Sequence, residues 1–234
     1  DSKVTVSKGN RSVHVKFPPP PPPGRLVLEG HGLAVRYGDN EVFRDVELYV
    51  ERGERLLIMG LNGAGKTSLL KALAGERPAD SGTLTFGHKV VAGYYAQEHE
   101  GIQAGRSILE HLREQVPQAA DSDLRAIVGA MGLTGDKVHQ DAGTLSGGEK
   151  TKLALGILVA GRHNLLLLDE PTNNLDPGSR EAVADGLRGW PGSIVLVSHD
   201  APFVRDLSPN KVLMLPEGTL DLWSDDYLEL VEMA

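Results

Sequence analysis

The chain has 234 residues, enough to bury a core of its own, and its 40% hydrophobic and 24% charged residues are typical of a globular domain. A formal net charge of −8 argues against electrostatic capture of nucleic acid by the domain as a whole. The lack of cysteine excludes disulfides and fits a reducing cytoplasm, and no apolar run is long enough for a bilayer, so we expect a cytoplasmic chain without membrane insertion.

The first 24 residues differ in composition from the rest. Six consecutive prolines at 18–23 are followed by Gly24, and because proline has a fixed φ and no N–H donor, we predict a linker tail, 1–24, with a stiff polyproline II spacer. A ligand for a proline-binding module is the less favoured interpretation. The basic residues before the prolines form either a solvated tail, which is favoured, or an RNA contact. They are Lys3, Lys8, Arg11 and Lys16.

From residue 25 to residue 234 the pattern is that of one folded domain. Apolar residues alternate at 26–28, 33–37 and 46–50, which predicts antiparallel strands. The continuous apolar run 56–59 predicts a buried strand, and a helix at 67–74 follows it. The chain therefore begins with antiparallel strands and a strand–loop–helix unit.

Residues 98 to 143 have a different, helical pattern. Ser107 and Glu110 form a capping box ahead of one amphipathic stripe, and a second stripe runs from Leu124 to Met131. We predict a helical subdomain inserted at about 98–143.

The last third of the domain returns to alternating strands and helices. Ser146 and Glu149 form a second capping box, and Asp176 caps a helix that begins at Pro177. Buried strands are predicted at 165–168 and 194–197, and a hairpin around 216–218 precedes a short helix at 227–231. The predicted fold class is α/β, with a mainly parallel core sheet, an N-terminal antiparallel β subdomain and the inserted helical subdomain.

Residues 60–67 match the phosphate-loop pattern G-x-x-x-x-G-K-[ST] between a strand and a helix. Glycines let successive backbone N–H groups point at phosphate oxygens, and the helix N-terminus adds partial positive charge. Lys66 contributes a full charge, the Thr67 hydroxyl is a ligand for Mg²⁺, and Ser68 adds a phosphate hydrogen bond. The predicted triphosphate-binding residues are Gly60, Asn62, Gly63, Ala64, Gly65, Lys66, Thr67 and Ser68.

Two acidic residues, Asp169 and Glu170, directly follow the buried strand 165–168. Open α/β sheets place their ligands at the carboxyl ends of the strands. Asp169 is therefore a candidate for holding Mg²⁺, and Glu170 for orienting or deprotonating an attacking water. Two acids after a strand are a weak signal alone but a strong one beside the phosphate loop.

With these motifs in this order, the chain resembles the ATP-binding cassette (ABC) ATPases, which have a P-loop NTPase fold. The run from Leu145 through Ser146, Gly147 and Gly148 to Glu149 is similar to the signature motif of that family. The resemblance implies that ATP and Mg²⁺ are the cofactors, and that Ser146, Gly147 and Gly148 reach the γ phosphate of an ATP held by a second ABC domain, head to tail. Asp176 lies in the region similar to the D-loop.

The same resemblance implies roles for three more residues. Gln97 lies where the family has its Q-loop, which links Mg²⁺, attacking water and the helical subdomain; His199 matches the switch histidine; and Tyr37 matches the aromatic that stacks on adenine. The implied catalytic residues are thus Glu170, His199, Gln97 and Lys66, with Thr67, Gln97 and Asp169 at the metal. Tyr37 is otherwise an ordinary strand aromatic, and Gln97 a solvent-facing loop residue.

A narrower resemblance, to the ABC-F subfamily, rests on the segments 148–155, 170–176, 199–204 and 218–228. These proteins carry two ATPase domains on one chain and have no transmembrane domains, and many act on the ribosome as translation factors or in antibiotic resistance. Position 174 is Asn where many relatives have His. The proline-rich entry after a basic segment resembles the passage from the linker between the two domains into the second one, so we expect the C-terminal half of such a protein, slow as an ATPase alone. The alternatives are a transporter ATPase subunit docked on a membrane subunit and an ATP-switched regulatory module with little turnover.

Overall fold

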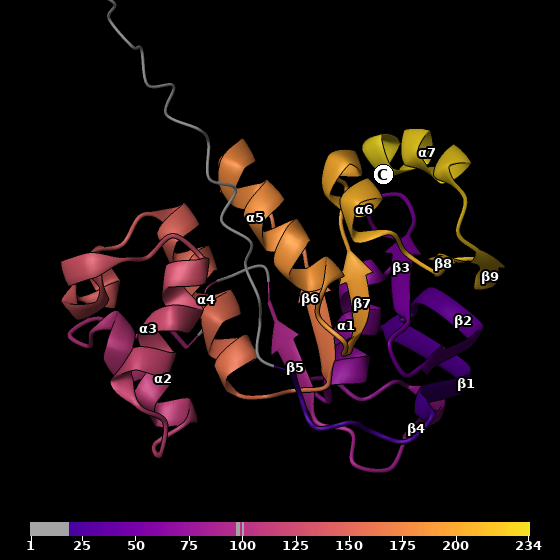
Figure 1. The fold of residues 1–234 in the computed structure, drawn as a ribbon. Coiled ribbons are helices and arrows are strands. Elements are labelled where there is room, and N and C mark those ends of the chain that lie inside the picture. Colours follow the sequence, from indigo (N-terminus) through magenta and orange to yellow (C-terminus); the bar gives the residue numbers. More distant parts are fainter. Residues whose placement is uncertain (1–18, 97–98, 100) are drawn as a thin grey trace, which may run out of the picture.

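The computed structural model describes residues 19–96, 99 and 101–234, and its core is a six-stranded sheet in the order β5-β6-β7-β3-β8-β9 (Figure 1). All neighbouring strands are parallel except β8 and β9, which form the predicted antiparallel hairpin. The strands are β3 (Arg55–Met59), β5 (Ala92–Tyr95), β6 (Leu165–Asp169), β7 (Ser193–Val197), β8 (Lys211–Met214) and β9 (Thr219–Leu222). The mainly parallel core sheet is thus confirmed.

A second, antiparallel sheet has the order β2-β1-β4, with β1 at Leu26–Tyr37, β2 at Asn40–Glu51 and β4 at Ser81–Phe86. The predicted strands 26–28 and 33–37 are one strand, β1, whose register shifts between Gly30 and Leu33, so the alternation breaks there without ending the strand. β4 was not predicted, because its side chains are almost all exposed and leave no apolar alternation.

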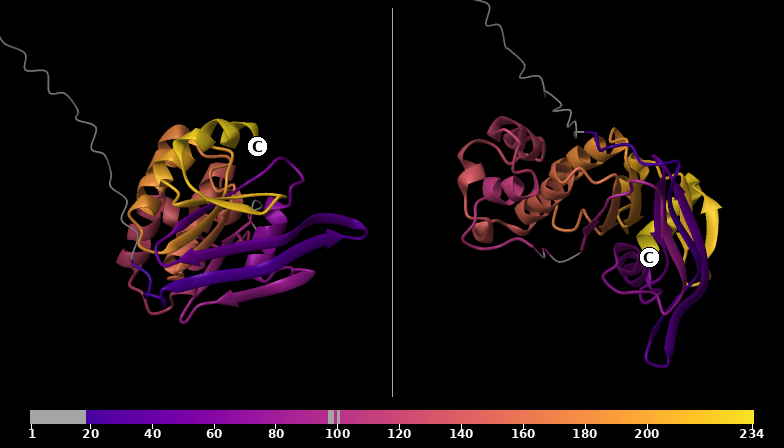
Figure 2. Two further views of the ribbon diagram at one scale, coloured as in Figure 1. Left: turned by 90° about the vertical axis from the view of Figure 1, so that its right-hand side faces the viewer. Right: turned by 90° about the horizontal axis from the view of Figure 1, so that it is seen from below.

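Two hydrophobic cores lie on opposite faces of the central sheet. Within β3, Leu57 and Met59 face a core built with α4, α5 and α6, whereas Leu56 and Ile58 face a core shared with α1 and the antiparallel sheet. Burial on both faces explains why β3 is apolar at consecutive positions. The helix α1 therefore lies between the two sheets, as Figures 1 and 2 show.

The helices cover both faces of the core and form one separate group. They are α1 (Lys66–Ala74), α2 (Ile108–Gln115), α3 (Asp121–Ala130), α4 (Gly147–Ala160), α5 (Pro177–Arg188), α6 (Ala201–Leu207) and α7 (Leu228–Met233). Both predicted capping boxes, Ser107 with Glu110 and Ser146 with Glu149, are present. Within the described part of the chain, no helix has the length and apolar character needed to cross a membrane.

The helices α2 and α3 stand apart from the sheets, in the region where the helical subdomain was predicted (Figure 1). They share a third core with α4, to which Leu153 and Ala160 contribute, while Leu155 and Val159 of the same helix pack toward the central sheet. The helix α4 therefore connects the two regions mechanically.

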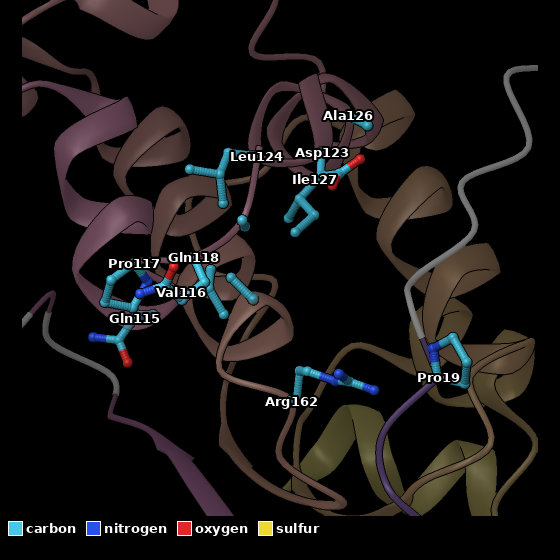
Figure 3. Close-up of a pocket in the computed structure, with 12 residues that line it drawn as sticks. Pro19, Gln115, Val116, Pro117, Gln118, Asp123, Leu124, Ala126, Ile127 and Arg162 are labelled. Atoms are coloured by element: carbon cyan, nitrogen blue, oxygen red, sulfur yellow. The ribbon is translucent and has the colours of Figure 1, made fainter. Parts of the chain in front are cut away.

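The proline segment is hydrogen-bonded to the folded domain through the Pro21 and Pro23 carbonyls, which the prediction of a linker tail did not include. The Asn164 side-chain amide donates to the Pro21 carbonyl at 3.1 Å, and the Gly24 N–H donates to His88 at 3.0 Å. Pro19 and Arg162 border a groove whose other wall is formed by α3 and the residues before it (Figure 3). Residues 1–18, including the predicted basic tail, lie outside the described part of the chain.

Replacing Asn164 with Ala should destabilise the fold by about 2–3 kcal/mol, because the fully buried amide also donates to the Lys89 carbonyl and accepts from the Val91 N–H, and Ala removes all three hydrogen bonds. Urea unfolding measures the difference. The matched control is Asn210→Ala, which removes an exposed amide with one backbone partner, Arg55, and should cost less than about 1 kcal/mol. Equal losses in the two variants would contradict this account of the proline segment.

Candidate functional site

The loop between β3 and α1 has a backbone that only glycine accommodates at three positions. Gly60, Gly63 and Gly65 have φ values of 152°, 85° and 98°. A Cβ on Gly60 would also lie 2.5 Å from the Leu215 carbonyl oxygen, so the loop is held tightly against the sheet. This geometry explains the spacing of glycines in the sequence.

The N-terminus of α1 has no capping partner of its own. Its N-cap residue, Gly65, offers no side-chain hydrogen bond, and the first turn carries no acidic residue. By contrast, α2, α4, α5 and α6 each have an N-cap side chain that accepts a backbone N–H. The free N–H groups and the helix dipole favour an anion at the start of α1.

A cavity of about 370 Å³ opens over this helix start. Its lining combines the phosphate loop with residues from the antiparallel sheet, namely Tyr37, Asn40, Val42, Asn62, Gly63, Gly65, Lys66, Thr67 and Ser68. The larger groove of Figure 3 contains none of the predicted site residues. The smaller cavity, whose lining includes Tyr37 and much of the phosphate loop, is the candidate site.

The Lys66 ammonium folds back over the loop and donates to the Gly60 carbonyl. Burial lowers the pKa of Lys66, and the nearby Glu170 and Asp169 carboxylates act in the opposite direction. A bound anion would likewise favour the charged amine.

Asp169, at the end of β6, joins the second half of the site to the loop. It is buried, and its Oδ2 accepts a hydrogen bond of 2.8 Å from the Thr67 hydroxyl. Burial raises the pKa of Asp169, although Thr67, Lys71 and Lys66 oppose the rise. These two oxygens fit Mg²⁺, which binds one or two carboxylates together with substrate phosphates. Among the described residues, no three acidic or histidine side chains lie together in a group that could hold a metal ion.

Glu170 and His199 meet at the ends of the adjacent parallel strands β6 and β7. The Glu170 carboxylate lies 2.9 Å from His199 Nδ1 and accepts the His199 backbone N–H at 3.3 Å. Glu170 has a φ of 50°, and its own N–H donates to the Val197 carbonyl. Burial is the main cause that raises the pKa of Glu170. Strain and a raised pKa in one carboxylate are features of catalytic positions.

Asp200 is a site-supporting residue to which the sequence analysis gave no role. Its Oδ2 accepts hydrogen bonds of 3.0 Å from Thr172 and from Arg180, and its Oδ1 caps α6. It therefore ties the loop after Glu170 to the residue next to His199. The only local signal is an Asp three residues before Phe203, the spacing of an N-cap.

The signature segment packs against the loop that follows Glu170. A Cβ on Gly148 would lie 2.6 Å from the Asn174 carbonyl oxygen, and Asn174 has a φ of 68°, a conformation that Asn tolerates well. Ser146 accepts the Glu149 N–H as the N-cap of α4. Across the residues that the structure describes, no hydrogen bond or ion pair joins 145–149 to 60–68, so the structure does not bring Ser146, Gly147 and Gly148 to this chain's own phosphate loop.

One further predicted residue, Asp176, does not line the cavity. Asp176 caps α5 by accepting from the Ser179 N–H and hydroxyl, and it is not among the cavity-lining residues. Gln97 lies outside the described part of the chain, so its predicted roles in catalysis and at the metal stay predictions.

Thr151 is a buried polar residue in α4 that sequence reasoning missed. Its hydroxyl oxygen lies 2.8 Å from His99 Nε2 and 3.3 Å from the Tyr95 hydroxyl, and the hydroxyl contacts the Asn173 carbonyl at 3.5 Å. It connects the segment after β5 with the loop beyond Glu170. Its position on the inward side of α4 was the available signal.

Tyr37, at the end of β1, forms a wall of the cavity and is half exposed. Its hydroxyl lies 2.8 Å from Ser68 Oγ, and the guanidinium carbon of Arg77 lies 4.0 Å from the ring centroid. The predicted adenine-stacking residue is thus beside the predicted phosphate loop.

Comparison with known proteins agrees with this arrangement. The chain is 39% identical over 189 residues to the probable ATP-binding protein YheS of Escherichia coli, which covers 80% of this chain and 30% of that protein. It is 35% identical to the probable ATP-binding protein YbiT of Escherichia coli, covering 87% of this chain and 39% of YbiT. It is 31% identical to ABC transporter F family member 5 of Arabidopsis thaliana over 219 residues, and the matched region is 93% of this chain and 32% of that protein. The chain therefore spans roughly a third of these relatives.

Solved structures show the same fold at lower sequence identity. A bacterial Atm1-family ABC exporter with ATP bound superposes with a TM-score of 0.75 at 17% identity, over 96% of this chain and 43% of that one. An inward-facing structure of a metal-chelate type ABC transporter superposes with a TM-score of 0.70 at 22% identity, over 86% of this chain and 84% of that one. The family model described as ABC transporter matches residues 43–173, more than half of the chain. The chain belongs to the ATP-binding cassette family, and its similarity to these relatives is consistent with an ATP-binding domain of the ABC-F type.

Proposed function

We propose that this domain binds Mg²⁺-ATP in the cavity over α1 and hydrolyses it to ADP and phosphate. The uncapped N-terminus of α1, with Lys66 folded over it, carries the proposal, because it offers backbone N–H groups and a cation to a triphosphate. Tyr37 offers its ring to the base at the other end of the cavity.

Thr67 and Asp169 would hold the magnesium ion, which when bound neutralises negative charge on the phosphates. The hydrogen bond between these two residues aligns both oxygens before any ligand enters. Gln97 is proposed as a further ligand from the family resemblance alone.

Glu170 is the proposed general base for the attacking water. As the water oxygen bonds to the γ phosphorus, the bond to the bridging oxygen of ADP breaks, and Glu170 takes the proton. Burial raises the pKa of this carboxylate above its ordinary value, which makes it a better base. His199, whose Nδ1 lies 2.9 Å from the Glu170 carboxylate, would orient that carboxylate. Its contact with the γ phosphate is proposed from the family resemblance alone.

The domain is one half of a composite site. Its signature segment packs against the loop after Glu170, away from its own phosphate loop, so Ser146 has no role toward the ATP that this chain binds. We propose a head-to-tail pair with a second ABC domain, in which each signature segment faces the partner's ATP. The relatives, about three times as long as this chain, have room for such a domain.

For the longer protein that carries this domain we propose action on the ribosome, as a translation factor or in antibiotic resistance, in the cytoplasm. The similarity to an F family member and to ATP-binding proteins supports this proposal over a transporter subunit. The transporter structures share only the fold with this chain.

Lys66→Ala should weaken Mg²⁺-ATP binding about 10- to 100-fold, because it removes a charge-assisted contact worth about 1.5–3 kcal/mol. Titration calorimetry measures the dissociation constant. The control is Arg205→Ala, which removes an exposed cation on α6, outside the residues that line the cavity, and should leave affinity nearly unchanged. Undiminished affinity in Lys66→Ala would remove the phosphate loop from the site.

Glu170→Gln should bind ATP but hydrolyse it about 10²- to 10⁴-fold more slowly, since the amide cannot accept the proton. Phosphate release and size-exclusion chromatography measure turnover and trapping of an ATP-bound pair. The exposed Glu181→Gln on α5 serves as the control and should behave like the unaltered domain. Turnover by Glu170→Gln at the unaltered rate would assign the base to another residue.

The full-length protein with Glu170→Gln should sediment with ribosomes when ATP is present and much less without it. If ATP closes the composite site, the closed state should be the one that binds. Centrifugation of a cell extract through sucrose, with ribosomes and membranes separated, measures this distribution. Sedimentation with membranes instead of ribosomes would favour the transporter alternative.

A further inference from the structure

Arg77 lies beside the base-binding end of the cavity and has no role in the mechanism above. The αL residue Gly75 ends α1, and Arg77 follows two residues later. Its guanidinium carbon lies 4.0 Å from the centroid of the Tyr37 ring, a distance at which a planar guanidinium stacks on an aromatic face.

The guanidinium is anchored from behind. Arg77 donates to the Arg36 carbonyl, and its Nη2 lies 3.6 Å from the Asp80 carboxylate. The same carboxylate accepts the Arg36 N–H at 2.6 Å. Arg77 and Asp80 therefore attach to the residue directly before Tyr37, so the guanidinium cannot move away from the ring without breaking these contacts.

The two faces of the Tyr37 ring have different surroundings. Tyr37 lines the cavity and Arg77 does not, and one terminal nitrogen of Arg77 is buried without a hydrogen-bond partner among the described residues. Because Arg77 is absent from the cavity lining, we assign its guanidinium to the ring face turned away from the cavity. The ring edge is also held, since the hydroxyl lies 2.8 Å from Ser68 Oγ.

We propose that Arg77 is a positioning residue for nucleotide recognition, which clamps the Tyr37 ring from behind so that its free face is presented to the base. This inference rests on the proposed ATP site and adds to it a three-layer stack of guanidinium, phenol and purine. Because the ring is held before the ligand arrives, less conformational freedom is lost on binding. The recognition is specific for the base end of the ligand and not for the phosphates.

The test compares ATP with inorganic tripolyphosphate, which has the phosphates but no base, each with Mg²⁺ in titration calorimetry. Arg77→Ala should weaken ATP binding about fivefold, the effect of one cation–π contact, and leave tripolyphosphate binding unchanged. Retained tripolyphosphate binding also shows that the variant is folded. Arg77→Lys should recover part of the ATP affinity, because it restores the charge without the planar stack.

Two further variants make the test specific. Arg25→Ala removes an exposed arginine, ion-paired with Glu51 beside the opposite end of β1, and should change neither affinity. Tyr37→Ala should also weaken the binding of ATP and not that of tripolyphosphate. If Arg77 acts through the ring, adding Arg77→Ala to Tyr37→Ala should have little further effect on ATP affinity.

Three outcomes would overturn the proposal. Tighter ATP binding by Arg77→Ala would mean that the guanidinium occupies the face that the base needs. Equal weakening of ATP and tripolyphosphate binding would mean that Arg77 has a general structural or electrostatic role. Unchanged ATP affinity would mean that Arg77 has no role in binding. Failure of the ATP site itself is distinguishable, because the unaltered domain would then bind neither ligand.

Discussion

The structure depends on one unsatisfied feature, the open N-terminus of α1. Among the described helices, α1 alone combines the absence of a side-chain N-cap with a first turn free of acidic residues. The glycines of the preceding loop expose backbone amides there at a conformational cost that ordinary turns avoid. A helix start left without a partner between two sheets is stable only because α1 is anchored by Leu69, Leu70 and Leu73 in a shared core. The site is thus supported by packing that has no part in the chemistry.

Parallel pairing of β6 and β7 supplies the other half of the site. Both strands end at the same edge of the sheet, which brings Glu170 within 2.9 Å of His199. Thr67, in the helix α1 that follows the neighbouring parallel strand β3, lies 2.8 Å from Asp169. The price of this arrangement is burial of two adjacent carboxylates, which raises the pKa of both. Cationic and hydrogen-bonding neighbours partly offset the burial, and a bound cation would complete the compensation.

The contacts around α4 explain how the half-site is connected to the helical region. Thr151 lies in contact with His99, Tyr95 and Asn173, and Gly148 allows the start of the helix to approach Asn174 closely. The same helix contributes to two hydrophobic cores. A displacement of the helical region would therefore also move the loop after Glu170, because α4 contacts that loop at Asn173 and Asn174.

The sequence by itself determined the phosphate loop, both capping boxes, the buried strands β3, β6 and β7 and the α/β class, because each depends on residues close together in the chain. It also placed Lys66, Thr67, Asp169, Glu170 and His199 in one site, since the ends of parallel strands converge. Only the tertiary structure decided that β4 joins the antiparallel sheet, that the prolines pack on Asn164, that Asp200 holds Thr172 and Arg180, and that Arg77 stacks on Tyr37. These contacts join residues far apart in the chain or exposed on its surface, where no local periodicity records the partner, so they were settled by how the sheets and helices pack.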